Sequence, residues 1–228
     1  MNLDLREQRL LPISIFFQIK SDNLINIVEI LKKVCYNSLC LTVHTYIEGS
    51  RFGTMALRRV VMFGEDTLRK TSRKVEVFDD KLWVLLDDMQ QTMDQFGGVG
   101  LASPQVGILR RVIVVEDSDT EKRVELVNPV ITKEVGQQRE VEGCLSSPGE
   151  WGYVKRPERI SLTASNRYGK EFQLDAKGVF AITICHEIDH LNGKLFTDLA
   201  DEMVEDEEEL EKAKRSRNRK CKRKKKRR

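Results

Sequence analysis

Apolar residues recur every three or four positions in one stretch of the chain, residues 80–96. They are Leu82, Leu85, Leu86, Met89, Met93 and Phe96. Asp79 or Asp80 can cap the start of this stretch, and Gly97-Gly98 can end it. A one-sided apolar stripe with such ends predicts an amphipathic helix that packs against the core.

A second stretch, residues 179–190, is apolar on almost every side of a helix. Its apolar residues are Val179, Phe180, Ala181, Ile182, Ile184 and Ile188. A helix without a polar face is expected to be buried. We therefore predict that any polar side chain on this helix lies inside the protein.

Shorter runs of β-branched residues predict strands. The predicted strands are Val112–Glu116, Val124–Asn128, Val130–Val135 and Gln138–Glu142. The glycine-rich segment Gly98–Gln105 is expected to be extended, with a backbone that another group approaches closely. It does not fit a dinucleotide-binding fingerprint, because a helix precedes the glycines where a strand is needed and Pro104 obstructs a following helix.

The two ends of the chain differ from the middle. Residues 1–54 are either a helical arm that covers the body or a loosely attached extension, and we favour the extension, with Met55 as the working start. Residues 212–228 hold 13 Lys or Arg and no acidic residue, which leaves 26 basic against 36 acidic residues in 1–211. We expect residues 201–228 to form a charged helix that continues as a basic tail.

Composition places the chain among globular proteins, with 40% hydrophobic and 33% charged residues over 228 positions. The five cysteines are odd in number and irregularly spaced, which favours a reducing compartment where thiols are available as metal ligands. We find no signal peptide and no apolar run of about 20 residues that could cross a bilayer. We therefore expect a cytoplasmic protein with no membrane partner.

The chain has only three histidines, and two of them, His186 and His190, lie four residues apart in the second predicted helix. Side chains at this spacing share one face of a helix, so the two imidazoles can bind one metal ion. Glu187 lies beside the first of them, as a general base does in metal-dependent hydrolases. The alternative is a polar rim on an ordinary helix, but buried imidazoles and carboxylates without partners are costly.

A catalytic site of this type needs a third protein ligand. Phe196 stands where a further histidine would complete one metalloprotease pattern, so that pattern is excluded. Residues 207–211 offer glutamates for a different protease class, although they lie in a highly charged run. Cys144, which follows a predicted strand, is the better candidate because a thiolate suits such a site.

With these motifs assembled, the chain resembles the peptide deformylase family over residues 55–200. Gly98–Gln105, Glu142–Ser146 and His186–His190 occur in the order and at about the distances of its three signature motifs. The resemblance implies the following roles: metal ligands Cys144, His186 and His190, catalytic acid/base Glu187, oxyanion partners Gln105 and the Leu145 backbone N–H, and peptide contacts Val99, Gly100 and Gly143. Ser103 and Cys185 depart from the residues usual in the family.

The resemblance further implies an α+β fold, in which antiparallel strands surround the metal-binding helix and the 80–96 helix packs outside. It implies hydrolysis of the formyl group from the formyl-methionine of new polypeptides, with release of formate. The ion implied is Fe²⁺, for which Zn²⁺, Ni²⁺ or Co²⁺ can substitute. From helix geometry we expect Ile182, with Val179 and Thr183, to contact the methionine side chain.

The basic tail, residues 212–228, is either simply solvated or attaches the protein to ribosomal RNA, and no DNA partner is expected. Two other functions remain open at this point. One is a zinc protease with a glutamate ligand, in which replacing Cys144 would leave metal binding intact. The other is a non-catalytic RNA-associated protein with a structural metal, although structural sites usually have four protein ligands.

Overall fold

The computed structural model describes residues 57–118, 120–213 and 215. The expectations for residues 1–54 and for the tail beyond residue 215 lie outside the described residues. The described chain is an α+β fold with two antiparallel sheets, as the sequence predicted. None of the helices in the described part is both long enough and apolar enough to span a membrane.

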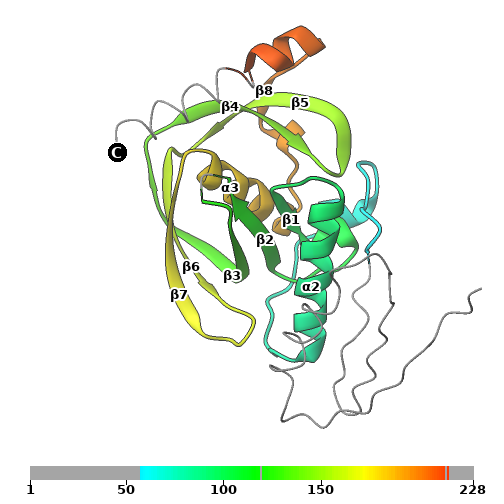
Figure 1. Ribbon diagram of the computed structural model, residues 1–228, viewed down its shortest axis with the longest axis vertical. Coiled ribbons are helices and arrows are strands. Elements are labelled where there is room, and N and C mark those ends of the chain that lie inside the picture. Colours follow the sequence, from blue (N-terminus) through cyan, green and yellow to red (C-terminus); the bar gives the residue numbers. More distant parts are fainter. Residues whose placement is uncertain (1–56, 119, 214, 216–228) are drawn as a thin grey trace, which may run out of the picture. The chain divides into compact units, whose positions relative to one another are not determined.

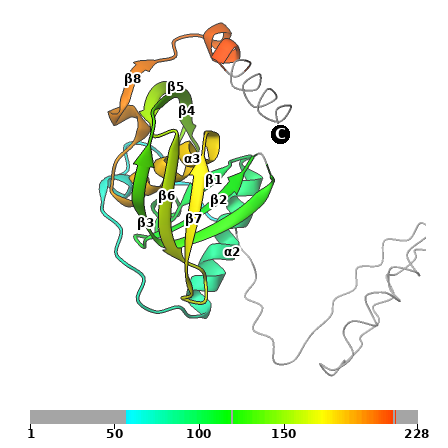
Figure 2. The same cartoon turned by 90° about the vertical axis from the view of Figure 1, so that its left-hand side faces the viewer.

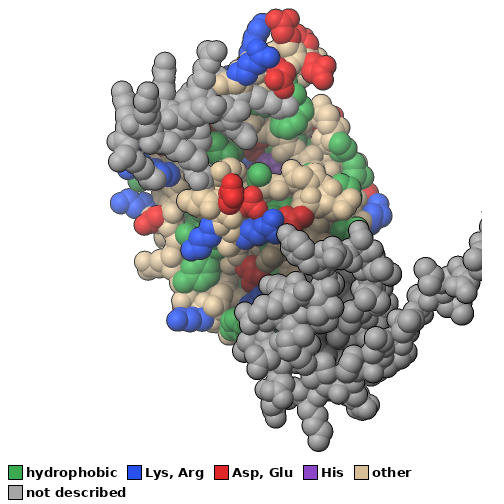
Figure 3. All heavy atoms as spheres, in the orientation of Figure 1, with side chains coloured by type: hydrophobic (Ala, Val, Ile, Leu, Met, Phe, Trp, Pro, Cys, Tyr) green, Lys and Arg blue, Asp and Glu red, His purple; other side chains and the backbone are tan. Residues whose placement is uncertain are grey.

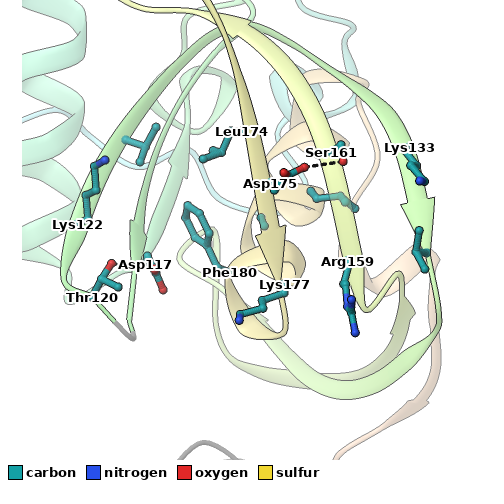
Figure 4. A pocket seen from close by; sticks show the side chains of 14 residues that line it. Asp117, Thr120, Lys122, Lys133, Arg159, Ser161, Leu174, Asp175, Lys177 and Phe180 are labelled. Atoms are coloured by element: carbon teal, nitrogen blue, oxygen red, sulfur yellow. Dashed lines mark hydrogen bonds between the residues drawn. The ribbon is translucent and has the colours of Figure 1, made fainter. Parts of the chain in front are cut away.

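The larger sheet has the strand order β1-β2-β3-β6-β7, and every neighbouring pair is antiparallel. Its strands are β1 (Gly100–Ala102), β2 (Val112–Asp117), β3 (Lys122–Val135), β6 (Arg159–Ser165) and β7 (Glu171–Lys177). Figure 2 shows β3, β6 and β7 side by side across the molecule. The curled sheet leaves an open pocket between the β2–β3 hairpin and β7, with Phe180 between its walls (Figure 4).

The smaller sheet has the order β4-β5-β8. It consists of β4 (Gln138–Cys144), β5 (Ser147–Arg156) and β8 (Ala200–Met203). We expected a charged helix from residue 201, but β8 pairs with β5 and helical structure begins only at residue 207. Ala200 and Met203 both lie against Gly152, where a Cβ atom would stand 2.9 Å from each of them, so this glycine leaves room for the short acidic stretch to join the sheet.

Two longer helices complete the fold: α2 (Asp80–Gln95) and α3 (Val179–Leu191). The Asp79 side chain accepts a hydrogen bond from the Leu82 N–H and caps α2, in agreement with the sequence prediction. The apolar stripe of α2 packs on β1 and β2 from outside (Figure 1). Short 3-10 turns occupy η2 (Asp66–Arg69), η3 (Ser103–Val106) and η4 (Phe196–Asp198).

The helix α3 lies between the two sheets, as Figure 1 shows. Ala181, Ile184 and Leu191 are completely buried against Ile113 and Leu126 of the larger sheet. The opposite side of α3 faces the smaller sheet through β5. Because apolar packing fixes α3 from more than one side, polar residues on it are held in defined positions.

One predicted pair of strands is a single strand. We predicted separate strands at 124–128 and 130–135, but β3 runs through both, with a register shift between Val127 and Val130. Asn128 adopts a left-handed backbone at this shift, with φ of 54°. Its side-chain amide exchanges two hydrogen bonds with the Val75 backbone and so holds the segment that precedes α2.

Candidate active site

The three predicted metal ligands converge in the structure. The Cys144 sulfur, at the end of β4, lies 3.2 Å from His190 Nε2. One ligand atom from each of Cys144, His186 and His190 lies within 4.8 Å of the other two. The two histidines come from successive turns of α3, with ring centroids 4.9 Å apart. No other cluster of this kind occurs in residues 57–118, 120–213 and 215, so the glutamates at 207–211 join no such group.

The donor set fits a divalent metal ion. Bonds of about 2.0–2.3 Å in a tetrahedron place ligand atoms about 3.5 Å apart, which agrees with this spacing. His190 is 1% exposed, and its Nδ1 has no hydrogen-bond partner among the described residues. One cysteine sulfur and two imidazole nitrogens this close together are a donor set that suits a divalent transition-metal ion.

Glu142 orients one ligand. Its carboxylate accepts a hydrogen bond from His186 Nδ1 at 2.9 Å, which leaves the other ring nitrogen, Nε2, as the donor to a metal. Arg156 in β5 donates to both oxygens of Glu142, at 2.8 and 3.0 Å. Burial raises the pKa of Glu142, but the hydrogen bonds from His186 and Arg156 outweigh it and hold this pKa below its ordinary value.

Arg156 also contacts the helix α3. Its Nη1 donates to Asp189 Oδ2 at 2.5 Å, so one buried guanidinium connects β5, β4 and α3. Glu142 and Asp189 lie within the sequence motifs but had no predicted role, and Arg156 was not predicted from the sequence. An acidic residue two positions before a cysteine ligand was the available signal for Glu142, whereas Arg156 lies in an unremarkable strand.

Glu187 is placed for proton transfer. It is 4% exposed, and its Oε2 has no hydrogen-bond partner among the described residues. Burial raises the pKa of Glu187 to about 7, although His186 lowers it in part. A carboxylate with a pKa near neutrality can both accept and return a proton under physiological conditions.

Gly100 makes room for Glu187. A Cβ atom on Gly100 would lie 2.5 Å from Glu187 Oε1 and 2.8 Å from Thr183 Cγ2. The close approach of a group to this glycine-rich backbone, which the sequence predicted, is therefore the approach of Glu187 itself. Gly143 is constrained in the same way, because a Cβ atom there would lie 2.6 Å from the Trp151 ring.

Gln105 points its amide nitrogen at the site. Its Oε1 accepts a hydrogen bond from the Ala102 N–H at 2.8 Å, which fixes the orientation of the amide. Its Nε2 then lies 3.4 Å from the Cys144 sulfur and 3.3 Å from Ser146 Oγ. Gln105 is 1% exposed, so this donor is held firmly inside the site.

A cavity of about 790 Å³ opens beside these residues. Its lining includes every predicted catalytic and substrate-binding residue, namely Val99, Gly100, Gln105, Gly143, Leu145, Ile182 and Glu187, and the ligands Cys144 and His186. Val179, Thr183, Trp151 and Phe96 line it as well. Figure 3 shows a small area of histidine surface among hydrophobic side chains, which agrees with a site that solvent can reach.

Two strand edges border the cavity. In the described part of the chain, β1 is an edge strand that pairs only with β2, and β4 is an edge strand that pairs only with β5. Gly100 of β1 and Gly143 of β4 both line the cavity. The arrangement offers unpaired backbone groups to an extended chain that enters it.

Cys185 has no part in the cavity. Its side chain is 6% exposed and belongs to the apolar cluster between α3 and the larger sheet. Burial raises the pKa of its thiol to about 12, so it stays protonated. The residue is a small apolar packing element beside the first histidine ligand.

Comparisons with known proteins point to one family. The family model described as "Polypeptide deformylase" matches residues 57–206. A protein named peptide deformylase from Caldicellulosiruptor bescii is 48% identical over 154 residues, which cover 68% of this chain and 92% of the relative.

Solved structures show the same similarity. A peptide deformylase from Legionella pneumophila superimposes with a TM-score of 0.61 at 37% identity and covers 76% of this chain and 99% of its own. A class I type b peptide deformylase from Acinetobacter baumannii, solved with Met-Ala-Ser bound, superimposes with a TM-score of 0.60 at 34% identity. The match covers 64% of this chain and 99% of the Acinetobacter chain.

Proposed function

The chain belongs to the polypeptide deformylase family and removes the N-formyl group from new polypeptides, and we propose that Cys144, His186 and His190 hold the metal for this reaction. The observation that carries this assignment is the convergence of the three ligand atoms within 4.8 Å beside a buried glutamate. The reaction releases formate from the N-terminal formyl-methionine.

The family is metal-dependent, and a divalent ion bound by these ligands would polarise the formyl carbonyl and lower the pKa of the attacking water. We propose Fe²⁺ as the ion in the cell, with Zn²⁺, Ni²⁺ or Co²⁺ as substitutes. The mixed sulfur and nitrogen ligands support this, since such sets accept several first-row divalent ions. Glu142 supports the assignment, because its contact with Nδ1 of His186 fixes the tautomer that can act as a ligand.

Glu187 acts as the general base and acid in this proposal. Its Oε2 accepts the proton of the attacking water and then returns it to the amine nitrogen as the carbon–nitrogen bond breaks. The absence of a protein partner for Oε2 among the described residues supports this role. The raised pKa of Glu187, about 7, allows both transfers near neutral pH.

Gln105 and the Leu145 backbone N–H stabilise the oxygen of the formyl group as it gains negative charge. The Gln105 amide is already oriented by Ala102 and Ser146, so it need not reorganise during the reaction. Leu145 follows the ligand Cys144 directly and lines the same cavity. Each such donor contributes about 3 kcal/mol to transition-state stabilisation.

The substrate backbone binds as an added strand between the edges of β1 and β4, near Val99, Gly100 and Gly143. The methionine side chain contacts Ile182, Val179 and Thr183, which line the cavity on the α3 side. The Met-Ala-Ser peptide in the Acinetobacter relative begins with the residue that the deformylated product would carry. That relative supports a cavity in which methionine occupies the first position.

The basic tail, residues 212–228, attaches the enzyme to ribosomal RNA in this proposal, because its 13 Lys or Arg residues match a polyanion. The substrate exists on new polypeptides, which supports action in the cytoplasm next to the ribosome. We further propose that residues 55–200, with β8 added, are the catalytic domain and that residues 1–54 are an extension to it.

Formate release from a formyl-Met-Ala-Ser peptide tests the proposal. The parent protein should release stoichiometric formate, and Glu187→Ala should lose at least about 100-fold in kcat with an unchanged metal content. Cys144→Ala tests the glutamate-ligand alternative, in which metal would stay bound. Full metal content in Cys144→Ala, or equal activity in Glu187→Ala, would contradict the assignment.

A further inference from the structure

Seven basic residues lie on three chain segments whose backbones meet near the C-terminal end of α3. They are Arg69, Lys70, Arg73, Lys74, Arg110, Arg111 and Lys194, and we call them the basic surface. The three segments that carry them, residues 69–74, 110–111 and 191–194, contain no acidic residue. Their charge is opposite to that of residues 1–211 as a whole, which carry ten more acidic than basic residues.

Backbone contacts hold the three segments together. Arg73 and Arg110 form a parallel bridge, and the Arg111 N–H donates to the Arg73 carbonyl at 2.8 Å. The Ser72 N–H donates to the Leu191 carbonyl at the end of α3, also at 2.8 Å. Gly193 lies against the Arg69 carbonyl, so closely that a Cβ atom would stand 2.4 Å from that oxygen. The basic surface is therefore one fixed feature of the fold.

Most of its charges are uncompensated. Six of the seven residues are exposed, and Arg111 is half-buried. Arg69 pairs with Asp198, but Lys70, Arg73, Lys74, Arg110 and Lys194 have no ion pair with any described acidic residue. Like charges on adjacent segments repel one another, and an anion that binds across them relieves the repulsion.

Arg111 is the most pre-organised member. Its Nη1 donates to Asn192 Oδ1 at 2.9 Å and its Nη2 donates to the Pro129 carbonyl at 3.4 Å, and both of these acceptors are neutral. Burial lowers the pKa of the Arg111 guanidinium, since its charge is partly removed from water without an opposite charge beside it. An incoming phosphate would supply that charge and find the guanidinium already oriented.

We propose that the basic surface binds the phosphate backbone of RNA, as a contact on the folded domain that is additional to the tail. Several cations spread over three segments suit a ligand with repeated negative charges better than a single small anion. The choice of RNA among polyanions rests on the proposed function, because a substrate carried by new polypeptides brings the enzyme to RNA-rich particles. An acidic protein segment is the alternative that the experiment must separate.

A second group of cations offers a matched control. Lys133, Arg159 and Lys177 come from β3, β6 and β7 and line the open pocket of the larger sheet, where Asp117 and Asp175 are interspersed with them (Figure 4). They have no ion pair with a described residue either. Arg159 of β6 and Lys177 of β7 lie directly opposite each other on these adjacent strands. Because acidic side chains lie among these cations and repel phosphate, we expect this group not to bind an RNA backbone.

The test compares two full-length triple variants with equal charge change: Arg73→Gln, Lys74→Gln, Lys194→Gln against Lys133→Gln, Arg159→Gln, Lys177→Gln. Binding to a 20-base-pair RNA duplex is measured by fluorescence anisotropy at several salt concentrations. We expect the first variant to reduce the slope of log K against log salt by about 2 to 3, since each lost phosphate contact contributes about 0.9. The pocket variant should keep the parental slope.

Equal reductions of the slope in both variants would overturn the proposal, because net charge alone would then explain binding. An unchanged slope in the first variant would also overturn it. Poly-glutamate of the same charge is the second probe, and equally tight binding that depends equally on the basic surface would also overturn it. Deformylation of a short formyl-Met peptide should remain parental in both variants. Loss of activity in the parent protein would instead count against the proposed function, so the two failures are distinguishable.

Discussion

The Gly100 backbone and the Glu187 carboxylate are in such close contact that a single methyl group on Gly100 would lie 2.5 Å from Glu187 Oε1. The residues belong to different elements, since Gly100 begins β1 and Glu187 lies in the middle of α3. This approach fixes the position of the carboxylate that we propose is catalytic, relative to the strand that we propose binds the substrate.

Gly100→Ala should displace Glu187 and reduce kcat at least tenfold, while the metal content stays near the parental value. The reason is that the added methyl group cannot fit beside Oε1, and proton transfer depends on position within fractions of an ångström. Gly149→Ala is the control, because a Cβ atom there meets nothing within 4 Å, although its φ of 87° will cost some stability. Parental kcat in Gly100→Ala would show that the contact has no catalytic importance.

Replacement of Cys144, the proposed ligand, and replacement of Cys185, a buried thiol, should differ in their effect on metal content. Cys144→Ala is expected to reduce bound metal from about one ion per chain to a small fraction, since two imidazoles alone hold the ion weakly. Cys185→Ala should keep the metal, because that thiol packs in the apolar cluster. Elemental analysis of the purified proteins measures both. Comparable metal loss in the two variants would mean that Cys144 is not a ligand.

Glu142→Gln should weaken metal affinity about 10- to 100-fold and destabilise the fold by about 3–5 kcal/mol. The change leaves Arg156, which is 7% exposed, without its main counter-charge. Asp201→Asn is the control, since it breaks exposed pairs with Arg139 and Lys155 and should cost less than about 1 kcal/mol. Urea unfolding and metal titration give the two quantities, and equal destabilisation of both variants would contradict the structural importance of Arg156.

The stability of the metal-stripped protein should depend on pH through Glu187. Burial raises its pKa in the folded state from 4.5 to about 7, so its protonated form is the one that folding favours. The contribution of Glu187 to the free energy of unfolding is complete below about pH 4.5. It is lost as the pH rises through 7, and the total loss is about 3 kcal/mol. The difference in unfolding free energy between the parent and Glu187→Gln should therefore fall across this window. Parallel pH profiles for the two proteins would be inconsistent with a raised pKa.

Ile182→Phe should raise KM for formyl-Met peptides by about tenfold or more and leave the metal content intact. Ile182 is 6% exposed and lines the cavity one turn before His186, so a larger ring would fill the space proposed for methionine. Steady-state kinetics with peptides and metal analysis of the same sample test this. A loss of metal that parallels the loss of affinity would show that Ile182 supports the metal site instead of the pocket.

The convergence of Cys144, His186 and His190 could be predicted from sequence because these residues lie in short, ordered motifs, while their role as metal ligands stays a prediction. His186 and His190 share a helical face at a fixed spacing, and Cys144 follows a recognisable strand. The α2 cap at Asp79 was also predictable, since capping is a local interaction. The α+β class followed from the resemblance, and the sheets confirm it.

Long-range partners could not be predicted in the same way. Arg156 contacts Glu142 and Asp189 across 14 and 33 positions, and nothing in the pattern of β5 distinguishes it from a surface arginine. The strand at Ala200–Met203 was expected to be helical because its acidic residues resemble the charged segment after it. Its pairing depends on Gly152 of β5, which a reading of residues 200–211 alone cannot include.

The unpaired edges of β1 and β4 have a consequence for the range of proteins that one such enzyme can process. Hydrogen-bonding groups along a strand edge bind the backbone amides and carbonyls that every polypeptide has. These contacts do not depend on which residues follow the first methionine. Discrimination is then left to a single side-chain pocket at the start of the chain. One catalyst can in this way serve a whole proteome.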